Sequence, residues 1–274
     1  MSGRRAPIVL LTDFGTRDTY VGQMKLVIAG IAPEAPVIDL SHGVSPQDVA
    51  EGAWLLDVAM PYLPEGSVVV AVVDPGVGTA RAGLVLRSGT RLLVGPDNGL
   101  LSVGLPPALR RAAARGGSRV ELEEGWAWRV ENRSLMLPAP SATFHGRDVF
   151  APVAAQLWRG VPPEEVGPPA REVVVLPPFL AEAAPDGTLR GEVIHVDRFG
   201  NLVTTVHGSQ VGRDATVLVG DARIEGLSRT FADVSPGELL AHVDSSGFLE
   251  VACREGSAAE RLGLGRGAPV TVIP

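Results

Sequence analysis

The first half of the chain alternates short apolar runs with segments of helical periodicity. The apolar runs of strand length are residues 8–11, 37–40 and 67–73. Residues 20–31 place apolar side chains at helical spacing and stop before Pro33. The run at 67–73 is continuously apolar after its first residue, as expected of a strand covered on both faces. This alternation predicts an α/β layer with a largely parallel central sheet.

Other patterns extend this layer. Ser45 and Pro46 have the composition of a helix start, with Ser45 as the N-cap and Pro46 in the first position of a helix that runs to residue 58. Residues 83–86 and 91–94 read as two strands divided by a turn. Residues 149–158 read as a further helix.

The pattern changes in the last third of the chain. A proline-rich stretch leads into a segment with the composition of a linker, and short strands between turns follow it. These strands are expected at residues 191–196, 202–206, 215–219, 239–243, 248–251 and 270–273. We therefore predict an N-terminal α/β domain over 1–178, a linker over 179–187, and a smaller, all-β, barrel-like domain over 188–274.

Composition narrows the class of protein. Apolar residues make up 45% of the chain, but no apolar run approaches the length of about 20 residues that spans a bilayer. The apolar run at 6–11 is too short for a signal-peptide core, so a cytoplasmic location is expected. A net charge of −7 without a basic block argues against nucleic-acid binding. The single cysteine, Cys253, excludes an intramolecular disulfide and a multi-cysteine metal cage.

Three carboxylates follow predicted strands. Asp13, Asp74 and Asp97 each come directly after an apolar run. Ligands of parallel sheets gather at the carboxyl ends of strands, so these side chains are expected at one edge. Asp97 is also followed by Asn and Gly, which is a strong turn signal and favours a structural role for it.

Three separated segments carry groups suited to catalysis. They are residues 11–15, 73–81 and 143–148, and they contain Asp74, Arg81 and His145. Taken singly, Asp74 fits a tight turn, Arg81 a solvated surface charge, and His145 a structural histidine. Together, an Asp, an Arg and a His can position and deprotonate a water molecule without a metal. Their common location in turn segments favours this joint site.

The same segments resemble a known family. Thr12-Asp13-Phe14-Gly15, Asp74-Pro75-Gly76-Val77-Gly78 and Thr143-Phe144-His145-Gly146-Arg147-Asp148, with residues 197–201 and 244–249, resemble the S-adenosylmethionine (SAM) hydroxide adenosyltransferases and the related fluorinases and chlorinases. The resemblance covers Ile8 to Val272. It implies an N-terminal α/β domain, a C-terminal barrel-like domain and a homotrimer. It also implies that SAM binds between one subunit's N-terminal domain and its neighbour's C-terminal domain, with no cofactor.

Within that family, the halogenases differ where the nucleophile is handled. They carry a Tyr where this chain has Asp74, and they lack the arginine found here as Arg81. A carboxylate repels a halide anion but suits a water that must lose a proton. The resemblance therefore favours water as the nucleophile.

The resemblance also assigns binding roles. Asp13 would hold the ribose hydroxyls, Asp197 the methionine ammonium, and Ser245 the methionine carboxylate. Asn201 would contact adenine, Phe231 would stack on it, and Phe144 would also line the substrate site. Gln47 stands where the halogenases have a Trp, and Ser246 where they have an Arg.

The predicted reaction is hydrolysis of SAM to adenosine and L-methionine, by attack of water or hydroxide on the ribose C5′. Asp74, Arg81 and His145 would be the catalytic residues, without a metal. Three alternatives stay open at this point. They are a chloride-using halogenase, a module that binds or senses an adenosyl ligand without turnover, and a metal-dependent hydrolase that uses Asp13, Asp74, Asp97 and His145.

Overall fold

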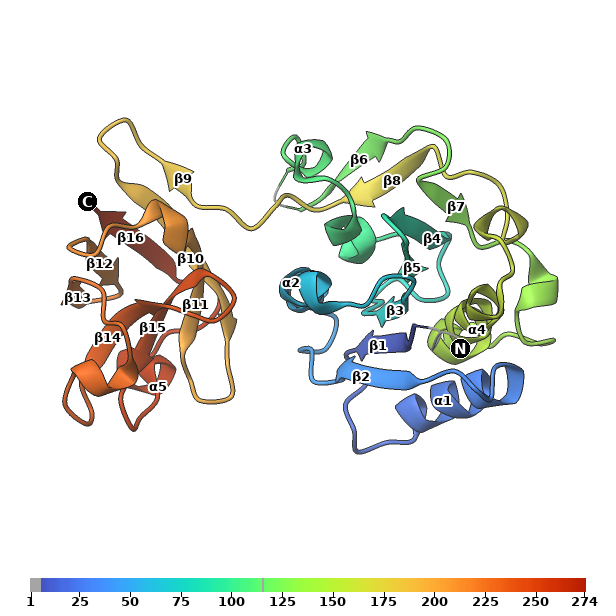
Figure 1. Ribbon diagram of the computed structural model, residues 1–274, viewed down its shortest axis with the longest axis horizontal. Helices are drawn as coiled ribbons and strands as arrows, with labels where there is room; N and C mark the ends of the chain where they lie inside the picture. The colour runs from blue at the N-terminus through green and yellow to red at the C-terminus, as the bar shows by residue number, and fades with distance from the viewer. Residues whose placement is uncertain (1–5, 115) are drawn as a thin grey trace, which may run out of the picture. The chain divides into compact units, whose positions relative to one another are not determined.

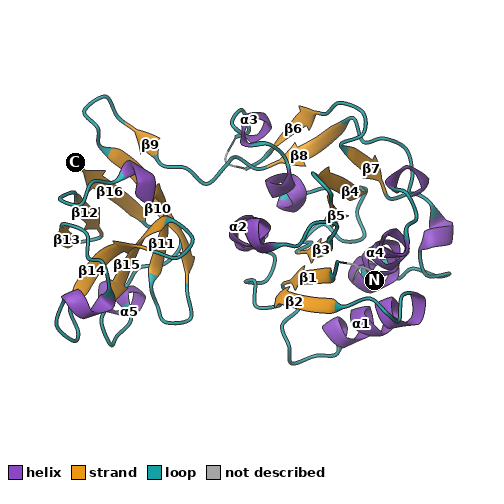
Figure 2. Ribbon diagram, viewed as in Figure 1, coloured by secondary structure: helices purple, strands orange, loops and turns teal. Residues whose placement is uncertain are grey.

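The computed structural model describes residues 6–114 and 116–274 and divides into two compact units (Figure 1). The division falls between Pro178 and Phe179. The first unit holds a six-stranded sheet with helices, and the second is built mainly of β-strands (Figure 2). The predicted class, an α/β domain followed by a smaller all-β domain, is confirmed.

The central sheet of the first unit is mixed. In spatial order its strands are β2 (Val37–Ser41), β1 (Ile8–Thr12), β3 (Val68–Val72), β5 (Arg91–Pro96), β4 (Gly83–Ser88) and β7 (Ala127–Arg129). The first three pairings are parallel, whereas β4 pairs antiparallel with both β5 and β7. The antiparallel part follows from the tight turn at Gly89, whose φ of +59° closes a hairpin. The sheet is thus parallel on the side that carries Asp13 and Asp74.

Helices cover both faces of this sheet. Helices α1 (Tyr20–Ile31) and α4 (Ala151–Arg159) pack together on one face, and α2 (Val49–Ala59) lies on the other (Figure 1). The strand run Val68–Val72 is wholly buried, as its continuous apolar sequence predicts. A two-stranded ribbon of β6 (Ser118–Glu121) and β8 (Glu172–Val175) and the short helix α3 (Pro107–Arg110) complete the unit.

Short helical turns connect these elements. They are η1 (Met60–Tyr62), η2 (Leu100–Gly104), η3 (Arg133–Leu135), η4 (Gly146–Phe150) and η5 (Pro163–Glu165). Among them, η4 is a single π-helical turn that leads directly into α4. Such turns often occur at functional sites, and this one begins next to His145.

The predicted start of α2 is wrong. The helix begins at Val49 with Asp48 as its N-cap, and the Asp48 carboxylate accepts a hydrogen bond from the Glu51 N–H at 2.9 Å. Gln47 has a left-handed backbone with φ of +66°, which prevents a helix from starting at Ser45. The Ser45 N–H instead donates to the Glu51 carboxylate at 2.8 Å.

The second unit is a nearly closed antiparallel barrel. In spatial order its strands are β13 (Ala222–Glu225), β12 (Thr216–Val219), β16 (Pro269–Ile273), β10 (Leu189–Val196), β11 (Leu202–His207), β15 (Phe248–Cys253) and β14 (Leu239–Val243), with β9 (Glu182–Ala183) beside β10. The end strands β13 and β14 approach one another, which nearly closes the sheet around an apolar core. Turns η6 (Gly208–Gln210) and η7 (Phe231–Asp233) and helix α5 (Ala258–Leu262) connect the strands.

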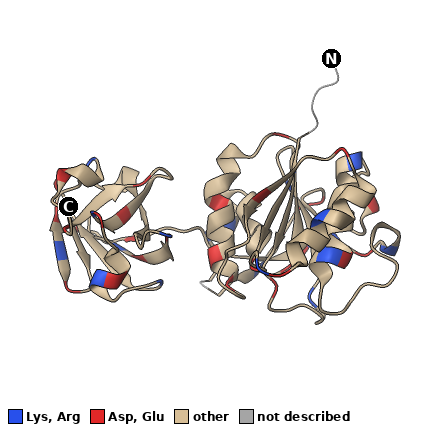
Figure 3. Cartoon of the chain, turned by 90° about the horizontal axis from the view of Figure 1, so that it is seen from below, with Lys and Arg blue, Asp and Glu red and all other residues tan. Residues whose placement is uncertain are grey.

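Charged residues of both signs are intermingled on both units (Figure 3). Among residues 6–114 and 116–274, no helix is long and apolar enough to cross a membrane.

Candidate active site

The three motif segments meet at one cavity in the first unit. This cavity has a volume of about 250 Å³, and its lining includes Asp13, Asp74, Phe144 and His145. Asp13 directly follows β1, and Asp74 lies two residues beyond β3. Because β1 and β3 are parallel neighbours in register, their carboxyl ends bring these two carboxylates to the same edge.

Two glycines allow the segments to approach closely. Gly78 has a φ of +79°, and a Cβ atom there would lie 2.8 Å from the Ala142 carbonyl oxygen. A Cβ atom on Gly146 would lie 3.1 Å from the Phe14 ring. Glycine therefore lets the loop after β3 pack against the loop before η4, and lets η4 pack against the loop after β1.

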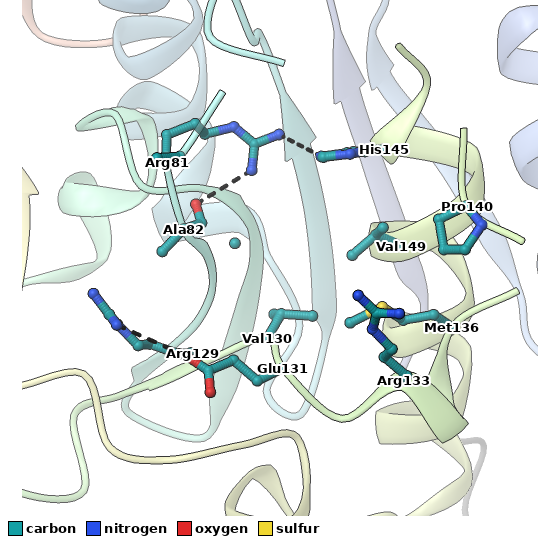
Figure 4. Close-up of a pocket in the computed structure, with 12 residues that line it drawn as sticks. Arg81, Ala82, Arg129, Val130, Glu131, Arg133, Met136, Pro140, His145 and Val149 are labelled. Atoms are coloured by element: carbon teal, nitrogen blue, oxygen red, sulfur yellow. Dashed lines mark hydrogen bonds and ion pairs between the residues drawn. The ribbon is translucent and has the colours of Figure 1, made fainter. Parts of the chain in front are cut away.

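Asp74, Arg81 and His145 form one hydrogen-bonded cluster. The Arg81 Nε–H donates to Asp74 Oδ1 at 2.8 Å, and Arg81 Nη2 donates to Asp74 Oδ2. Nη2 also contacts His145 Nδ1 at 2.9 Å (Figure 4). The Asp74 and Arg81 side chains are 5% and 12% exposed, so this two-pronged ion pair is nearly shielded from water.

The protonation state of His145 follows from this contact. A guanidinium group only donates, so Nδ1 of His145 must accept, and its ring proton is assigned to Nε2. Burial lowers the pKa of His145, and the nearby Arg81 lowers it further, against the weaker opposing effects of Asp74 and Asp148. His145 is therefore a neutral imidazole near pH 7, with Nε2–H as a donor.

Asp13 is held by a backbone group that the sequence analysis did not identify. The Gln47 N–H donates to Asp13 Oδ2 at 2.8 Å, and both residues line the 250 Å³ cavity. The left-handed backbone of Gln47 costs conformational energy. Within the described residues, Asp13 Oδ1 has no such partner, so it is available to a ligand hydroxyl.

A second group of side chains fixes the loop that carries Phe144 and His145. Asp148 is almost fully buried and accepts from Arg147 at 2.6 Å and from the Ser141 N–H at 2.8 Å. Burial opposes ionisation of Asp148, but the bonds from Arg147 and Ser141 outweigh it and lower its pKa. The Arg147 guanidinium also lies 4.9 Å from the centre of the Phe144 ring.

Aromatic rings complete this wall of the site. Phe144, Phe14 and Tyr20 contact one another edge-to-face, with ring centres 5.2 to 6.0 Å apart. Phe14 and Phe144 line the cavity. Phe144 was expected here only from the family resemblance, and no motif in the sequence indicated the contribution of Tyr20 from α1.

Asp97 lies at the same carboxyl edge as Asp13 and Asp74, because β5 pairs in parallel with β3, but it does not line the 250 Å³ cavity. Its carboxylate accepts the Val174 N–H at 2.7 Å and lies 3.6 Å from Arg119. Burial raises the pKa of Asp97, and these partners compensate only in part. Asp97 ties the β5 end to strand β8, as the alternative structural interpretation predicts. Among the described residues, no three His, Cys, Asp or Glu side chains are grouped as metal ligands would be.

Two of the remaining predicted binding residues share one loop of the second unit. Asp197 Oδ1 accepts the N–H groups of Phe199 at 2.9 Å and of Asn201 at 2.8 Å. Asp197 Oδ2 accepts from the Asn201 side-chain amide at 3.0 Å. Asn201 is buried, whereas Asp197 is half-buried and Phe199 exposed. The loop between β10 and β11 is thus held rigid by its own side chains.

The other two residues lie on separate turns of the same unit. Phe231 is partly exposed on η7, with its ring 4.8 Å from that of His242. Ser245 is exposed in the turn between β14 and β15, where Asp244 accepts the N–H groups of Ser246 and Phe248. These loops are preorganised by their own hydrogen bonds before any ligand binds, and they present their side chains at the surface of the unit.

Sequence comparison places both units in one family. Residues 8–167 match the SAM hydroxide adenosyltransferase N-terminal domain, and residues 191–271 match its C-terminal domain. A protein of Thermus thermophilus named (R)-S-adenosyl-L-methionine hydrolase is 45% identical, over 97% of this chain and 99% of its own length. A protein of the same name from Salinispora tropica is 44% identical, over 94% of each chain.

More distant relatives and solved structures agree with this placement. A fluorinase of Actinopolyspora mzabensis is 28% identical, over 98% of this chain and 97% of its own. The crystal structure of an uncharacterized conserved protein from Thermotoga maritima is 36% identical and superimposes with a TM-score of 0.85, covering 97% of this chain and all of the other. The chain belongs to the SAM hydroxide adenosyltransferase family.

Proposed function

We propose that the protein hydrolyses S-adenosyl-L-methionine to adenosine and L-methionine. The observation that carries this proposal is the Asp74–Arg81–His145 cluster, which lies beside a cavity that also presents the Asp13 carboxylate. Relatives 44–45% identical over nearly the whole chain are named (R)-S-adenosyl-L-methionine hydrolases, which supports the same reaction here.

Activation of the nucleophile is the demanding part of this reaction. The sulfonium of SAM is a good leaving group and needs no acid, whereas water has a pKa of about 15.7. In the observed arrangement, His145 Nδ1 is occupied by Arg81, so His145 orients the water through Nε2–H. The Asp74 oxygens retain lone pairs beyond those that accept from Arg81, and Asp74 takes the proton as the water attacks C5′. Arg81 stabilises the developing hydroxide.

The charge of the cluster supports water over halide. Asp74 and Arg81 form a paired and nearly neutral unit, so the site offers no excess positive charge for an anion. A halide would also have to give up its hydration next to the Asp74 carboxylate. Fluorinases are relatives at 28% identity, considerably below the hydrolases.

The binding residues on the second unit complete the proposed site from another copy of the chain. In a homotrimer, Asp197, Asn201, Phe231 and Ser245 of one subunit would contact the methionine and adenine parts of SAM bound at the 250 Å³ cavity of its neighbour. Mixing the inactive variant Asp74→Ala with the weakly binding variant Asp197→Ala tests it, at SAM concentrations well below KM. The mixed oligomers exceed the summed activity of the two variants if sites are shared between subunits, and do not if each chain builds its own.

The function is tested by product analysis. Purified protein is incubated with SAM in chelator-treated, halide-free buffer, and products are separated by chromatography and identified by mass spectrometry. Adenosine and methionine in equal amounts are expected. Binding of SAM without turnover would instead indicate a sensing module, and chloride-dependent 5′-chloro-5′-deoxyadenosine would indicate a halogenase.

Two further expectations accompany this proposal. The reaction needs no metal or other cofactor, so activity is expected to survive dialysis against a chelator, and loss that zinc or magnesium restores would contradict this. A cytoplasmic location also remains a prediction, and cell fractionation tests it.

A further inference from the structure

A second, larger cavity adjoins the catalytic cluster. It has a volume of about 570 Å³, and its lining comes from the start of β4, the segment from β7 to η3, and η4. Arg81 and His145 lie together at one end of it, and Arg129, Glu131 and Arg133 lie at the other (Figure 4). Of the described residues, only His145 lines both this cavity and the 250 Å³ cavity.

The catalytic cluster stands between the two cavities. Asp74 lines the smaller cavity and Arg81 the larger one, while their side chains are bonded to each other. Arg81 has five N–H groups, and four of them are used by the two Asp74 oxygens, His145 Nδ1 and the Ala82 carbonyl at 3.3 Å. Within the described residues this leaves one Nη1–H, on the same nitrogen that reaches Ala82 in the larger cavity.

In the proposed reaction, water must reach C5′ without displacing the bound substrate. The nucleophile must approach C5′ in line with, and opposite to, the departing sulfur. With SAM in the smaller cavity, substrate occupies the space beside Asp13 and Asp74. We infer that the larger cavity is the water passage of the enzyme, which delivers the nucleophile to Arg81 and His145 while substrate is bound. This inference rests on the proposed hydrolysis.

The lining of the passage suits water. Arg129 and Glu131 form a pair at 3.8 Å with about half of each side chain exposed, and Arg133 is also exposed, so this end is hydrated. Val149 and Met136 add an apolar wall, so the polar contacts for water come from the charged groups at the two ends of the cavity. In each turnover the water oxygen bonds to C5′ and the C–S bond breaks. Sulfur keeps the electron pair, and the proton passes through Asp74 to solvent.

The passage is tested by plugging it after the protein has folded. Cys253 is the only native cysteine and is buried, so a cysteine introduced as Arg133→Cys can be labelled selectively. Neutral methanethiosulfonates with methyl, ethyl and benzyl groups then place plugs of increasing size at this site, and a thiol reductant removes them. Arg159→Cys, at an exposed position at the end of α4 that does not line the cavity, is the matched control.

If the larger cavity is the water passage, kcat of labelled Arg133→Cys falls stepwise with plug size. We expect a fall of about tenfold or more for benzyl, with KM little changed. Reductant restores kcat, and labelled Arg159→Cys stays unchanged. Complete labelling without loss of kcat, a change in KM alone, or a thiol that reagents cannot reach would overturn the passage. The unsubstituted protein is assayed first, because failure to form adenosine there contradicts the proposed function itself.

Discussion

The two units of the chain prepare their proposed site residues in different ways. In the first unit, groups from segments up to 71 positions apart in sequence, Asp74 and His145 among them, are bonded through Arg81 into one shielded cluster. In the second unit, Asp197 bonds only within its own five-residue loop among the residues that the structure describes, and Ser245 lies exposed in a turn. Tertiary packing thus brings the proposed catalytic residues together, whereas the proposed binding residues of the second unit lie on loops held by local hydrogen bonds.

This difference predicts different effects for substitutions in the two units. A group inside the cluster cannot be removed without leaving a buried partner unpaired, which affects both the reaction and stability. Replacing a loop residue on the second unit affects only its own loop and the ligand contacts that this loop makes. Variants of the Asp74–Arg81–His145 cluster should therefore lower kcat, and variants of the binding loops in the second unit should raise KM.

The largest effect is expected for Asp74→Ala. It removes the proton acceptor and leaves Arg81 without its carboxylate partner, so kcat should fall by about 10³-fold. Thermal unfolding of the same protein measures the accompanying loss of stability. A kcat within tenfold of the parent would show that the cluster does not activate the nucleophile.

Asp148→Asn should have the next largest effect. Asp148 does not line either cavity, but it binds Arg147 and the Ser141 N–H and so positions Phe144 and His145. We expect kcat to fall by about 10- to 100-fold through misplacement of His145. Asp97→Asn is the matched control, because Asp97 is equally shielded but lies outside the site. Equal losses in both variants would mean that Asp148 acts only through stability.

Asp197→Ala should raise KM for SAM by about tenfold and leave kcat within about twofold. The control is Asp186→Ala, since Asp186 also accepts a backbone N–H in an exposed turn of the second unit, from Thr188 at 3.0 Å. A large fall in kcat with unchanged KM would contradict the view that this residue of the second unit acts in binding and not in the reaction.

The smallest effect concerns pH. Because burial and Arg81 hold the pKa of His145 below its ordinary 6.5, the neutral form persists as pH drops through 6.5. The acid limb of kcat attributable to His145 should therefore lie below pH 6.5 and be absent in His145→Gln. The folded state also binds fewer protons here than the unfolded state, so the contribution of His145 to stability is full above 6.5 and is lost as pH falls through the lower pKa. An acid limb at or above 6.5 would contradict the neutral assignment.

Much of the fold was predictable because its elements follow apolar periodicity. Helix Tyr20–Ile31 and strand Leu239–Val243 have the predicted bounds, since their patterns are uninterrupted and end at clear breaks. The ribbon of β6 and β8 was missed because exposed charged residues alternate along Ser118–Glu121. The start of α2 was misplaced because nothing in the residue type of Gln47 indicates a left-handed backbone.

Only those parts of the candidate site that depend on residue type could be predicted from the sequence. An Asp, an Arg and a His in three turns suggest a site, and the structure brings them into contact. The sequence could not show that Asp97 would instead bind Val174, because that depends on where a distant strand lies. Nor could it show that the Gln47 N–H holds Asp13, since backbone donors carry no sequence signal.

The most direct test of the central claim follows the oxygen atom. The protein is incubated with SAM in water enriched in oxygen-18, with chelator and without halide, and the adenosine is analysed by mass spectrometry beside the Asp74→Ala variant. We predict one oxygen-18 at the 5′ position of adenosine in each turnover, and a corresponding loss of product in the variant. Adenosine without the label, or labelled product formed equally fast by Asp74→Ala, would contradict activation of water by this cluster.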